Sequence, residues 1–180
     1  MIHFLGDLLV KQSLGSRNLV LVGFMGTGKS ATGKILAERL GRAFIDMDTT
    51  IEEREGRPIP RIFAESGEPH FRALERALVQ ELAARQELVV APGGGIVLNP
   101  DNIRDFAATG RVICLRATPE MILTRVGHDP NRPLLQTDDK LGRIRDLLGK
   151  RKALYDAIPL QIETDGKTPA QVADEILALG

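Results

Sequence analysis

A glycine-rich run that ends in lysine and serine occupies residues 23–30. It reads Gly-Phe-Met-Gly-Thr-Gly-Lys-Ser, the pattern G-x-x-x-x-G-K-S, and it directly follows the apolar stretch 18–22. Glycines allow the backbone to fold into a nest whose N–H groups point at one anion, and the helix expected next adds its positive end. The pattern indicates a nucleoside-triphosphate site in which Lys29 reaches the outer phosphates and the Ser30 hydroxyl binds the accompanying Mg²⁺. The nucleotide-binding residues that we expect in this run are Gly26, Thr27, Gly28, Lys29, Ser30 and Ala31.

Two carboxylates, Asp46 and Asp48, follow the next apolar stretch and are separated by one residue. On an extended chain, alternate residues face the same side. One carboxylate can assist Mg²⁺ through a water molecule, and the other can hydrogen-bond an acceptor hydroxyl beside the γ-phosphate. Asp48 is also a good N-cap for the helix expected after it, and the two roles are compatible. Beside a phosphate-binding loop, a functional role for this pair is favoured over a cap alone.

Three consecutive glycines, Gly93, Gly94 and Gly95, follow a third apolar stretch. Three glycines lose much backbone entropy on folding, and a turn needs only one or two of them. The close approach of a ligand to the backbone explains the triplet better than a turn does.

Three arginines have both a structural and a functional interpretation. Arg72 and Glu75 share a helix face, which would suit a surface ion pair. Arg132 lies in a segment whose glycine, prolines, asparagine and aspartate predict a loop. Such a loop arginine is either solvated or part of a lid that closes on phosphates and stabilises transferring charge. Arg151 follows a basic helical stretch that, taken alone, would be a solvated helix face.

Apolar runs rich in β-branched residues alternate with helical periods along the whole chain. We expect strands at 19–22, 43–46, 88–91, 112–116 and 160–163. We expect helices at 29–40, 49–55, 59–65, 69–85, 100–108, 119–126, 139–157 and 169–179. This alternation predicts an α/β fold with a parallel five-stranded sheet and right-handed crossovers. Ligands of such folds bind beyond the carboxyl ends of the strands, where the phosphate-binding loop, the carboxylates and the glycine triplet all lie.

Local signals mark several ends of these helices. Asn99, Thr118 and Thr168 each precede a proline, which is typical of a helix start. Glycines at 41, 56 and 110 are placed as helix stops.

Composition limits the class of protein. The chain has 180 residues, 43% of them hydrophobic, and 24 basic residues balance 24 acidic ones. One α/β domain is expected, and zero net charge argues against bulk binding of nucleic acid or a membrane surface. One cysteine, Cys114, excludes an intramolecular disulfide and fits a reducing, cytoplasmic compartment. No apolar run approaches a membrane span of about 20 residues.

The segment before the first strand, residues 1–17, carries no signal-peptide pattern. Its apolar spacing suits either a short amphipathic helix or a loose leader. We therefore expect a leader at 1–17 and a single domain at 18–180.

Read together, six segments resemble the shikimate kinase family of P-loop kinases. The resemblance runs from about residue 18 to the C-terminus, and it rests on the order of the segments as well as on their content. They are Gly-Phe-Met-Gly-Thr-Gly-Lys-Ser at 23–30, Phe-Ile-Asp-Met-Asp at 44–48, Ile-Phe-Ala-Glu-Ser-Gly-Glu-Pro-His-Phe-Arg-Ala-Leu-Glu at 62–75, Gly-Gly-Gly at 93–95, Arg-Pro-Leu-Leu at 132–135 and Arg-Lys-Ala-Leu-Tyr at 151–155.

The resemblance implies a three-layer αβα architecture with strand order 2-3-1-4-5, a substrate-binding segment at about 48–75 and a lid at about 126–137. It implies transfer of the γ-phosphoryl group of ATP to the 3-hydroxyl of shikimate, with Mg²⁺ as the cofactor, in the pathway to chorismate and the aromatic amino acids. Catalytic roles would fall to Lys29, Asp48 and Arg132, and substrate binding to Asp48, Arg72, Gly93, Gly94, Gly95 and Arg151. Arg125, Arg132, Thr168 and Pro169 would lie on the nucleotide side, and Ser30 and Asp46 (through water) on the metal side.

Two other functions remain open at this point. A gluconate-type sugar-acid kinase would also bind a carboxylate and hydroxyls, but the pair Arg72 and Arg151 and the lid sequence favour shikimate. A catalytically silent nucleotide-binding module could dispense with Asp48, Arg72 and Arg151, all of which are present. A nucleoside monophosphate kinase is less favoured, because its acceptor side must recognise a second phosphate and a base. We expect a monomer that binds shikimate and ATP, with no nucleic-acid or membrane partner.

Overall fold

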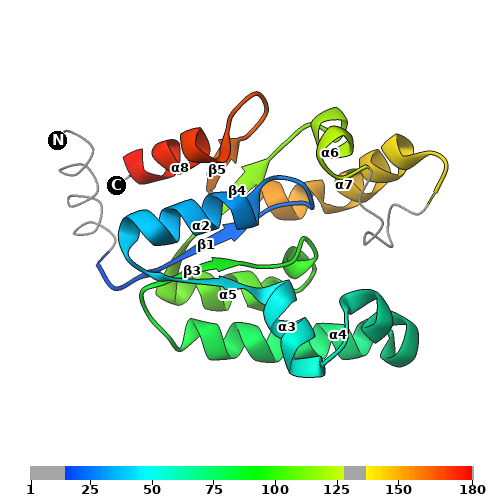
Figure 1. Cartoon of the computed structure of the whole chain (residues 1–180), viewed down its shortest axis with the longest axis horizontal. Coiled ribbons are helices and arrows are strands. Elements are labelled where there is room, and N and C mark those ends of the chain that lie inside the picture. Colours follow the sequence, from blue (N-terminus) through cyan, green and yellow to red (C-terminus); the bar gives the residue numbers. More distant parts are fainter. Residues whose placement is uncertain (1–14, 128–136, 180) are drawn as a thin grey trace.

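A parallel five-stranded sheet forms the centre of the molecule (Figure 1). The computed structural model describes residues 15–127 and 137–179. The strand order is β2-β3-β1-β4-β5, and every pairing is parallel, which confirms the predicted sheet and its order. The strands are β1 (Asn18–Val22), β2 (Ala43–Asp46), β3 (Leu88–Ala91), β4 (Gly110–Arg116) and β5 (Leu160–Glu163).

Helices cover both faces of this sheet (Figure 1). They are α2 (Lys29–Leu40), α3 (Met47–Glu55), α4 (Ile59–Ala83), α5 (Pro100–Thr109), α6 (Pro119–Val126), α7 (Lys140–Asp156) and α8 (Pro169–Ala178), with a short 3₁₀ turn, η1 (Ile96–Leu98). No helix within residues 15–127 and 137–179 is both long and apolar enough to cross a membrane.

The core divides into two clusters because successive residues of β1 face opposite sides of the sheet. Leu19 and Leu21 pack with the buried faces of α2 and α8. Val20 and Val22 pack in a larger cluster with α3, α4, α5, α6 and α7. The two clusters make the three layers that the sequence predicts.

Most helix ends follow the local signals. Asn99, Thr118 and Thr168 are N-caps whose side chains accept hydrogen bonds from the first turn, each with proline at the start of its helix. Gly41 and Gly56 end α2 and α3 with φ of 65°, a backbone region that favours glycine. Gly110, in contrast, has an extended φ of −142° and begins β4, so it is no left-handed stop.

Two predictions about the segment 46–83 were wrong in detail. Helix α3 begins at Met47 rather than at 49, because the Asp46 carboxylate accepts a hydrogen bond from the Thr49 N–H and is its N-cap. Asp48 is therefore not an N-cap and not a strand residue; it lies in the first turn of α3. The two helices expected at 59–65 and 69–85 are joined as α4, with a kink at Gly67 (φ 82°, ψ 165°).

Two predicted segments fall largely outside the described residues. Of the leader at 1–17, only residues 15–17 are described, and Ser16 accepts a backbone hydrogen bond of 2.9 Å from Glu87. Of the lid at 126–137, residues 128–136 lie outside the described part, and Arg132 is among them.

Candidate active site

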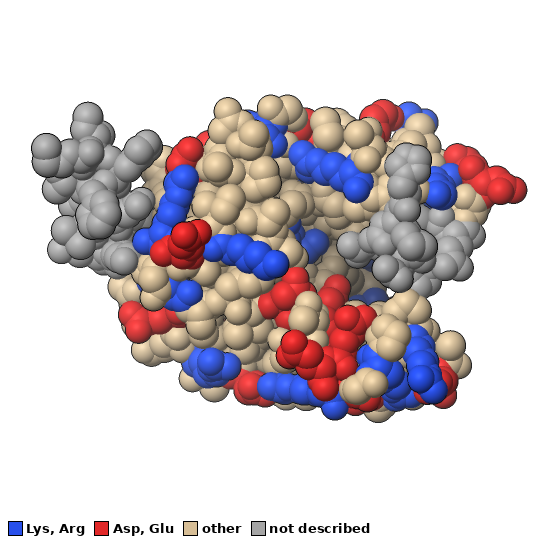
Figure 2. Space-filling view, viewed as in Figure 1, with Lys and Arg blue, Asp and Glu red and all other residues tan. Residues whose placement is uncertain are grey.

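A cavity of about 980 Å³ opens where β1, β2 and β3 end. Figure 2 shows the molecule hollowed on this face, with acidic and basic side chains gathered around the hollow. The volume lies at the upper end of the range for small-molecule sites. The lining includes Lys29, Ser30, Asp46, Asp48, Arg72, Gly93, Gly94, Gly95 and Arg151. The structure thus gathers into one cavity residues that the sequence places up to 122 positions apart.

The loop between β1 and α2 has the backbone of a phosphate-binding nest. Gly23, Gly26 and Gly28 have φ of 145°, 74° and 92°, values that L side chains rarely adopt. The loop is held from within, because the Thr27 hydroxyl donates to the Phe24 carbonyl at 2.8 Å. The N–H groups of the first turn of α2, at its positive end, add to the positive potential of the loop.

Lys29 places its ammonium group inside this loop. The side chain is 9% exposed, and Nζ donates hydrogen bonds of 2.9 Å to the carbonyl oxygens of Gly23 and Phe24. These bonds fix a positive charge beside the backbone N–H groups of the nest. An anion with several phosphates is the ligand that this arrangement suits.

Ser30 and Asp46 meet at the mouth of the same loop. The Ser30 hydroxyl donates to Asp46 Oδ2 at 2.6 Å, and Asp46 Oδ1 caps α3. A hydroxyl and a carboxylate are hard oxygen donors of the kind that Mg²⁺ prefers, with phosphate oxygens and water completing its octahedron. No group of three or more potential metal-ligating His, Cys, Asp or Glu side chains occurs among the described residues.

The glycine triplet leaves room for two charged side chains, those of Asp48 and Arg72. A methyl group on Gly93 would lie 2.6 Å from Asp48 Oδ1, and one on Gly95 would lie 2.5 Å from Arg72 Nη1. A methyl group on Gly94 would lie 3.1 Å from the Met25 backbone nitrogen of the phosphate-binding loop. The chain's own atoms therefore approach all three glycines closely, and Gly94 and Gly95 also form a turn, in which the Ile96 N–H donates to the Gly93 carbonyl at 3.1 Å. The approach of a ligand to this backbone stays a prediction.

Arg72 is held by two glutamates rather than being a solvated surface ion pair. Its Nη1 donates to Glu75 at 2.9 Å, and its Nη2 donates to Glu68 at 2.9 Å. The guanidinium also lies 5.2 Å from the centroid of the Phe71 ring. These contacts fix the orientation of a planar cation at the cavity wall, and an oriented guanidinium can bind a carboxylate through two parallel hydrogen bonds.

Glu75 is the residue at this wall whose environment the sequence does not reveal. It is 2% exposed, and its Oε1 has no hydrogen-bond partner among the described residues. Burial raises the pKa of Glu75, while the positive charge of Arg72 opposes that rise. The spacing of Arg72 and Glu75 predicts their contact, but burial of the glutamate depends on how α4 packs against the sheet.

Arg151 approaches the cavity from α7. It is 9% exposed, its Nη1 donates to the Gly94 carbonyl at 3.2 Å, and its guanidinium lies 5.8 Å from the Phe24 ring centroid. The solvated helix face considered for this residue is therefore wrong. Arg72 and Arg151 reach the glycine triplet from two different helices, so both guanidinium groups can act on one ligand.

A buried thiol and a buried phenol on this side of the sheet should make the fold less stable at high pH. Burial raises the pKa of Cys114 from 9.0 to about 11 and that of Tyr155 from 10.0 to about 12. The fold thus favours the neutral forms. The contribution of these two groups to the free energy of unfolding is complete below pH 9, where both are also neutral in the unfolded chain. It is lost as the pH rises from 9 to 12. Denaturant unfolding should show this decline. In Cys114→Ala the decline should be shallower between pH 9 and 11, and an unchanged slope would contradict the assignment.

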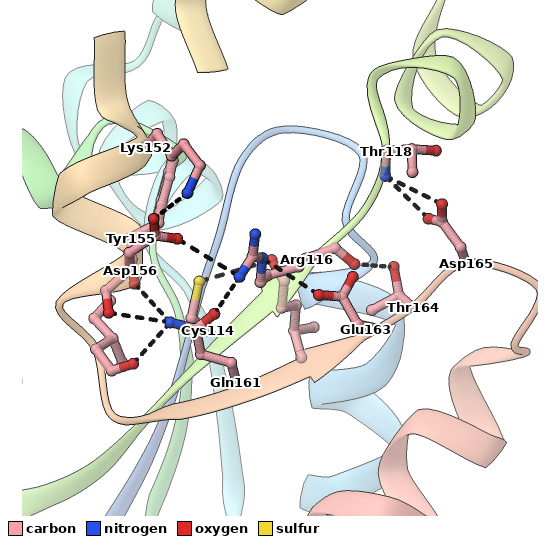
Figure 3. A network of polar contacts seen from close by, with 12 residues as sticks. Cys114, Arg116, Thr118, Lys152, Tyr155, Asp156, Gln161, Glu163, Thr164 and Asp165 are labelled. Carbon is pink, nitrogen blue, oxygen red and sulfur yellow. Dashed lines mark hydrogen bonds and ion pairs between the residues drawn. The ribbon is translucent and has the colours of Figure 1, made fainter. Parts of the chain in front are cut away.

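Polar contacts tie the end of β5 to β4 and α6 (Figure 3). The Thr164 hydroxyl donates to the Arg116 carbonyl at 2.8 Å, and both oxygens of Asp165 lie 3.2 Å from the Thr118 backbone nitrogen. Sequence analysis did not single out Thr164, although it is buried. These contacts give the loop after β5 a fixed position beside the start of α6.

Arg125 joins this region to the phosphate-binding loop. Its Nη1 donates to the Gly26 carbonyl at 3.1 Å and to the Thr164 hydroxyl at 3.0 Å, while Nη2 donates to the Thr164 carbonyl at 2.9 Å. The guanidinium plane is therefore fixed next to the nest, on the side where we expect the nucleotide base. Thr168 and Pro169 begin α8, are exposed and do not line the cavity.

The fold and the site together define a class of protein. A 2-3-1-4-5 parallel sheet with a glycine-rich phosphate-binding loop after β1, and with carboxylate and arginine side chains facing that loop, is the architecture of a P-loop kinase. The sequence profile of the shikimate kinase family matches residues 25–179. This chain belongs to the shikimate kinase family.

Individual relatives agree with this assignment. The chain is 41% identical to the shikimate kinase of Thermodesulfovibrio yellowstonii over 161 residues, which cover 89% of this chain and 93% of that protein. It is 44% identical to the shikimate kinase of Pelotomaculum thermopropionicum, with coverage of 89% and 94%. Among solved structures, the shikimate kinase from Acinetobacter baumannii in complex with shikimate matches with a TM-score of 0.89 and 40% identity, covering 94% of this chain and 96% of that one.

Proposed function

We propose that this protein transfers the γ-phosphoryl group of ATP to the 3-hydroxyl of shikimate, giving shikimate 3-phosphate and ADP. The observation that carries the proposal is the shared cavity: Lys29, Asp48 and the guanidinium groups of Arg72 and Arg151 open onto one space beside the phosphate-binding loop. A donor that carries phosphates and an acceptor with one carboxylate and several hydroxyls match these groups.

On the donor side, the nest of 23–30 and Lys29 bind the β- and γ-phosphates. Ser30 binds Mg²⁺ directly and Asp46 binds it through water, a role that their 2.6 Å contact supports. The bound cation would neutralise charge on the phosphates. Arg125, fixed between Gly26 and Thr164, lies on the base side of the same nucleotide. Thr168 and Pro169 stay a prediction for that side.

On the acceptor side, Arg72 and Arg151 bind the carboxylate of shikimate, and Asp48 accepts hydrogen bonds from its hydroxyls. The glycine triplet allows the ring to approach the backbone between these groups. Phosphoryl transfer passes through a loose transition state, so positioning and charge neutralisation supply most of the rate. We therefore assign Lys29 and Arg132 to electrostatic stabilisation, and Asp48 first to positioning. The role of Arg132, which lies outside the described residues, rests on the sequence alone.

Gly95→Ala should test the acceptor side with little effect on the fold. Gly95 has φ of −90° and ψ of 0°, a bridge conformation that residues with side chains also take at the third position of type I turns. The three atoms nearest to the added methyl group would be Nη1, Nη2 and Cζ of Arg72, so the methyl group would displace this guanidinium from its fixed position. Loss of one well-oriented charge-assisted bond should raise the KM for shikimate about tenfold, while the KM for ATP stays unchanged.

The matched control for this change is Gly149→Ala in the interior of α7, where the new methyl group would meet nothing within 4 Å among the described residues beyond its own stretch of helix backbone. It should stabilise the helix by up to about 1 kcal/mol and leave both KM values unchanged. Equal effects of the two substitutions on the shikimate KM would remove Arg72 from the acceptor site.

ADP release with a set of acceptors tests the proposed function. The protein is incubated with ATP and Mg²⁺ together with shikimate, gluconate, AMP or no acceptor. We expect turnover only with shikimate. Turnover with gluconate alone would overturn the substrate assignment in favour of a sugar-acid kinase, and acceptor-independent rates throughout would indicate a silent nucleotide-binding module. We further propose that the protein acts as a monomer in the cytoplasm, which size-exclusion chromatography with light scattering and cell fractionation would test.

A further inference from the structure

Tyr155, the only tyrosine of the chain, touches the glycine triplet but has no role in the function proposed above. It lies on α7 four residues after Arg151 and is 5% exposed. Its phenol donates a hydrogen bond of 2.6 Å to the Gly94 carbonyl, the same oxygen that Arg151 Nη1 reaches at 3.2 Å. Residues four apart share one helix face, which is why both side chains arrive at one acceptor.

The two hydrogen bonds to Gly94 differ in quality. The phenol bond has a length typical of a good O–H···O bond, whereas 3.2 Å is at the long end for N–H···O. A carbonyl oxygen has two lone pairs and can accept both. With the phenol in place, the oxygen stays satisfied if the guanidinium turns to another partner. Without the phenol, the guanidinium would have to hold this oxygen itself, because leaving a part-buried carbonyl unpaired costs free energy.

The Gly94 carbonyl belongs to the backbone that sets the geometry of the whole cavity. Gly94 packs against Met25 of the phosphate-binding loop, and its neighbours Gly93 and Gly95 pack against Asp48 and Arg72. Because burial raises the pKa of Tyr155 to about 12, the phenol remains a donor at every pH at which the protein would be assayed.

We propose that Tyr155 is a positioning residue for the acceptor: its phenol holds the Gly94 carbonyl, so that the Arg151 guanidinium is available to the substrate carboxylate. The proposal rests on the proposed function, since it assigns to Arg151 the carboxylate of shikimate. It predicts that removal of the phenol lowers kcat/KM for shikimate only when Arg151 is present.

A double-mutant cycle tests this dependence. Tyr155→Phe, Arg151→Met and the double variant are compared by kcat/KM for shikimate at saturating ATP, and by the KM for ATP. Tyr155→Phe should lower kcat/KM for shikimate about three- to tenfold, the worth of one hydrogen bond, and leave the KM for ATP unchanged. In the Arg151→Met background, the same substitution should change kcat/KM by less than about twofold.

Two controls separate positioning from a general loss of stability. Ile176→Val removes one methylene from α8 on the opposite face of the sheet, a change whose cost is comparable to that of a hydrogen bond. It should leave kcat/KM unchanged. Because Tyr155 is the sole tyrosine, growth with 3-fluorotyrosine alters this residue alone while keeping its donor, and kcat/KM should stay within about twofold of the wild type.

These experiments distinguish a failure of this inference from a failure of the proposed function. A wild-type protein without shikimate-dependent turnover contradicts the proposed function, and this inference falls with it. If the wild type is active but Tyr155→Phe keeps full kcat/KM, the inference alone is contradicted. The same holds if Tyr155→Phe lowers kcat/KM by the same factor in the presence and in the absence of Arg151. A loss of kcat/KM on 3-fluorotyrosine incorporation as large as that in Tyr155→Phe would also overturn it.

Discussion

Lys29→Met should lower kcat by about a hundred- to a thousandfold, which is the usual effect of removing one preorganised donor from developing charge. The Lys29 ammonium is fixed inside the phosphate-binding loop by the Gly23 and Phe24 carbonyls, so it meets the transferring phosphoryl group without reorganising. Methionine keeps the length of the side chain but supplies no charge. Steady-state ADP release at saturating ATP and shikimate measures the change.

The matched control is Lys34→Met, the same substitution at an exposed position of the same helix, α2. It should leave kcat unchanged. Thermal unfolding of both variants separates loss of chemistry from loss of the loop, since Lys29 also binds loop carbonyls. A Lys29→Met variant that is folded and retains a kcat within a few-fold of the wild type would exclude Lys29 from the transfer step.

Asp48→Asn should lower kcat/KM for shikimate by about a hundred- to ten-thousandfold, the range in which loss of a positioned acid–base group falls. The amide keeps the size of the carboxylate and can still fit against Gly93, but it loses the charge that accepts the hydroxyl hydrogen. ATP binding should be unchanged, because Ser30 and Asp46 occupy the metal side. Titration with ATP and steady-state rates with varied shikimate make the two measurements.

Glu53→Gln provides the control for this change, because it converts an exposed carboxylate of the same helix, α3, to an amide. It should change neither the affinity for ATP nor kcat/KM for shikimate. Wild-type turnover in Asp48→Asn would show that Asp48 neither positions nor deprotonates the acceptor, and a fall in ATP affinity would place it on the donor side instead.

The sheet was predictable because its information is local. Four of the five strands were predicted to within one residue at each end. β1, β2 and β3 are largely apolar runs, and β5 alternates apolar and polar residues. Gly41 and Gly56 end helices as expected because a left-handed C-cap depends on the residue at that position alone. Gly110 carries the same local signal, but pairing of β4 with β1 extends its backbone instead.

The sequence predicted which residues form the site better than it predicted the contacts between them. The strand-end rule places the phosphate-binding loop, Asp48 and the glycine triplet at one edge of the sheet from sequence alone. The rule says nothing about which carboxylate caps α3, and Asp46 takes that role because its oxygen meets the Thr49 N–H. The burial of Glu75 and the bond from Tyr155 to Gly94, 61 residues away, depend on how helices pack on the sheet. Pattern and spacing do not specify such individual side-chain contacts.

The position of the phosphate on the product tests the central claim most directly. The protein is incubated with ATP, Mg²⁺ and shikimate, and the product is examined by two-dimensional ³¹P–¹H NMR. The cavity geometry and the family together predict a single phosphate monoester whose phosphorus couples to the hydrogen on C3 of shikimate, formed in equal amount with ADP. Coupling to a different ring hydrogen, or ADP formed with inorganic phosphate and unmodified shikimate, would contradict the account.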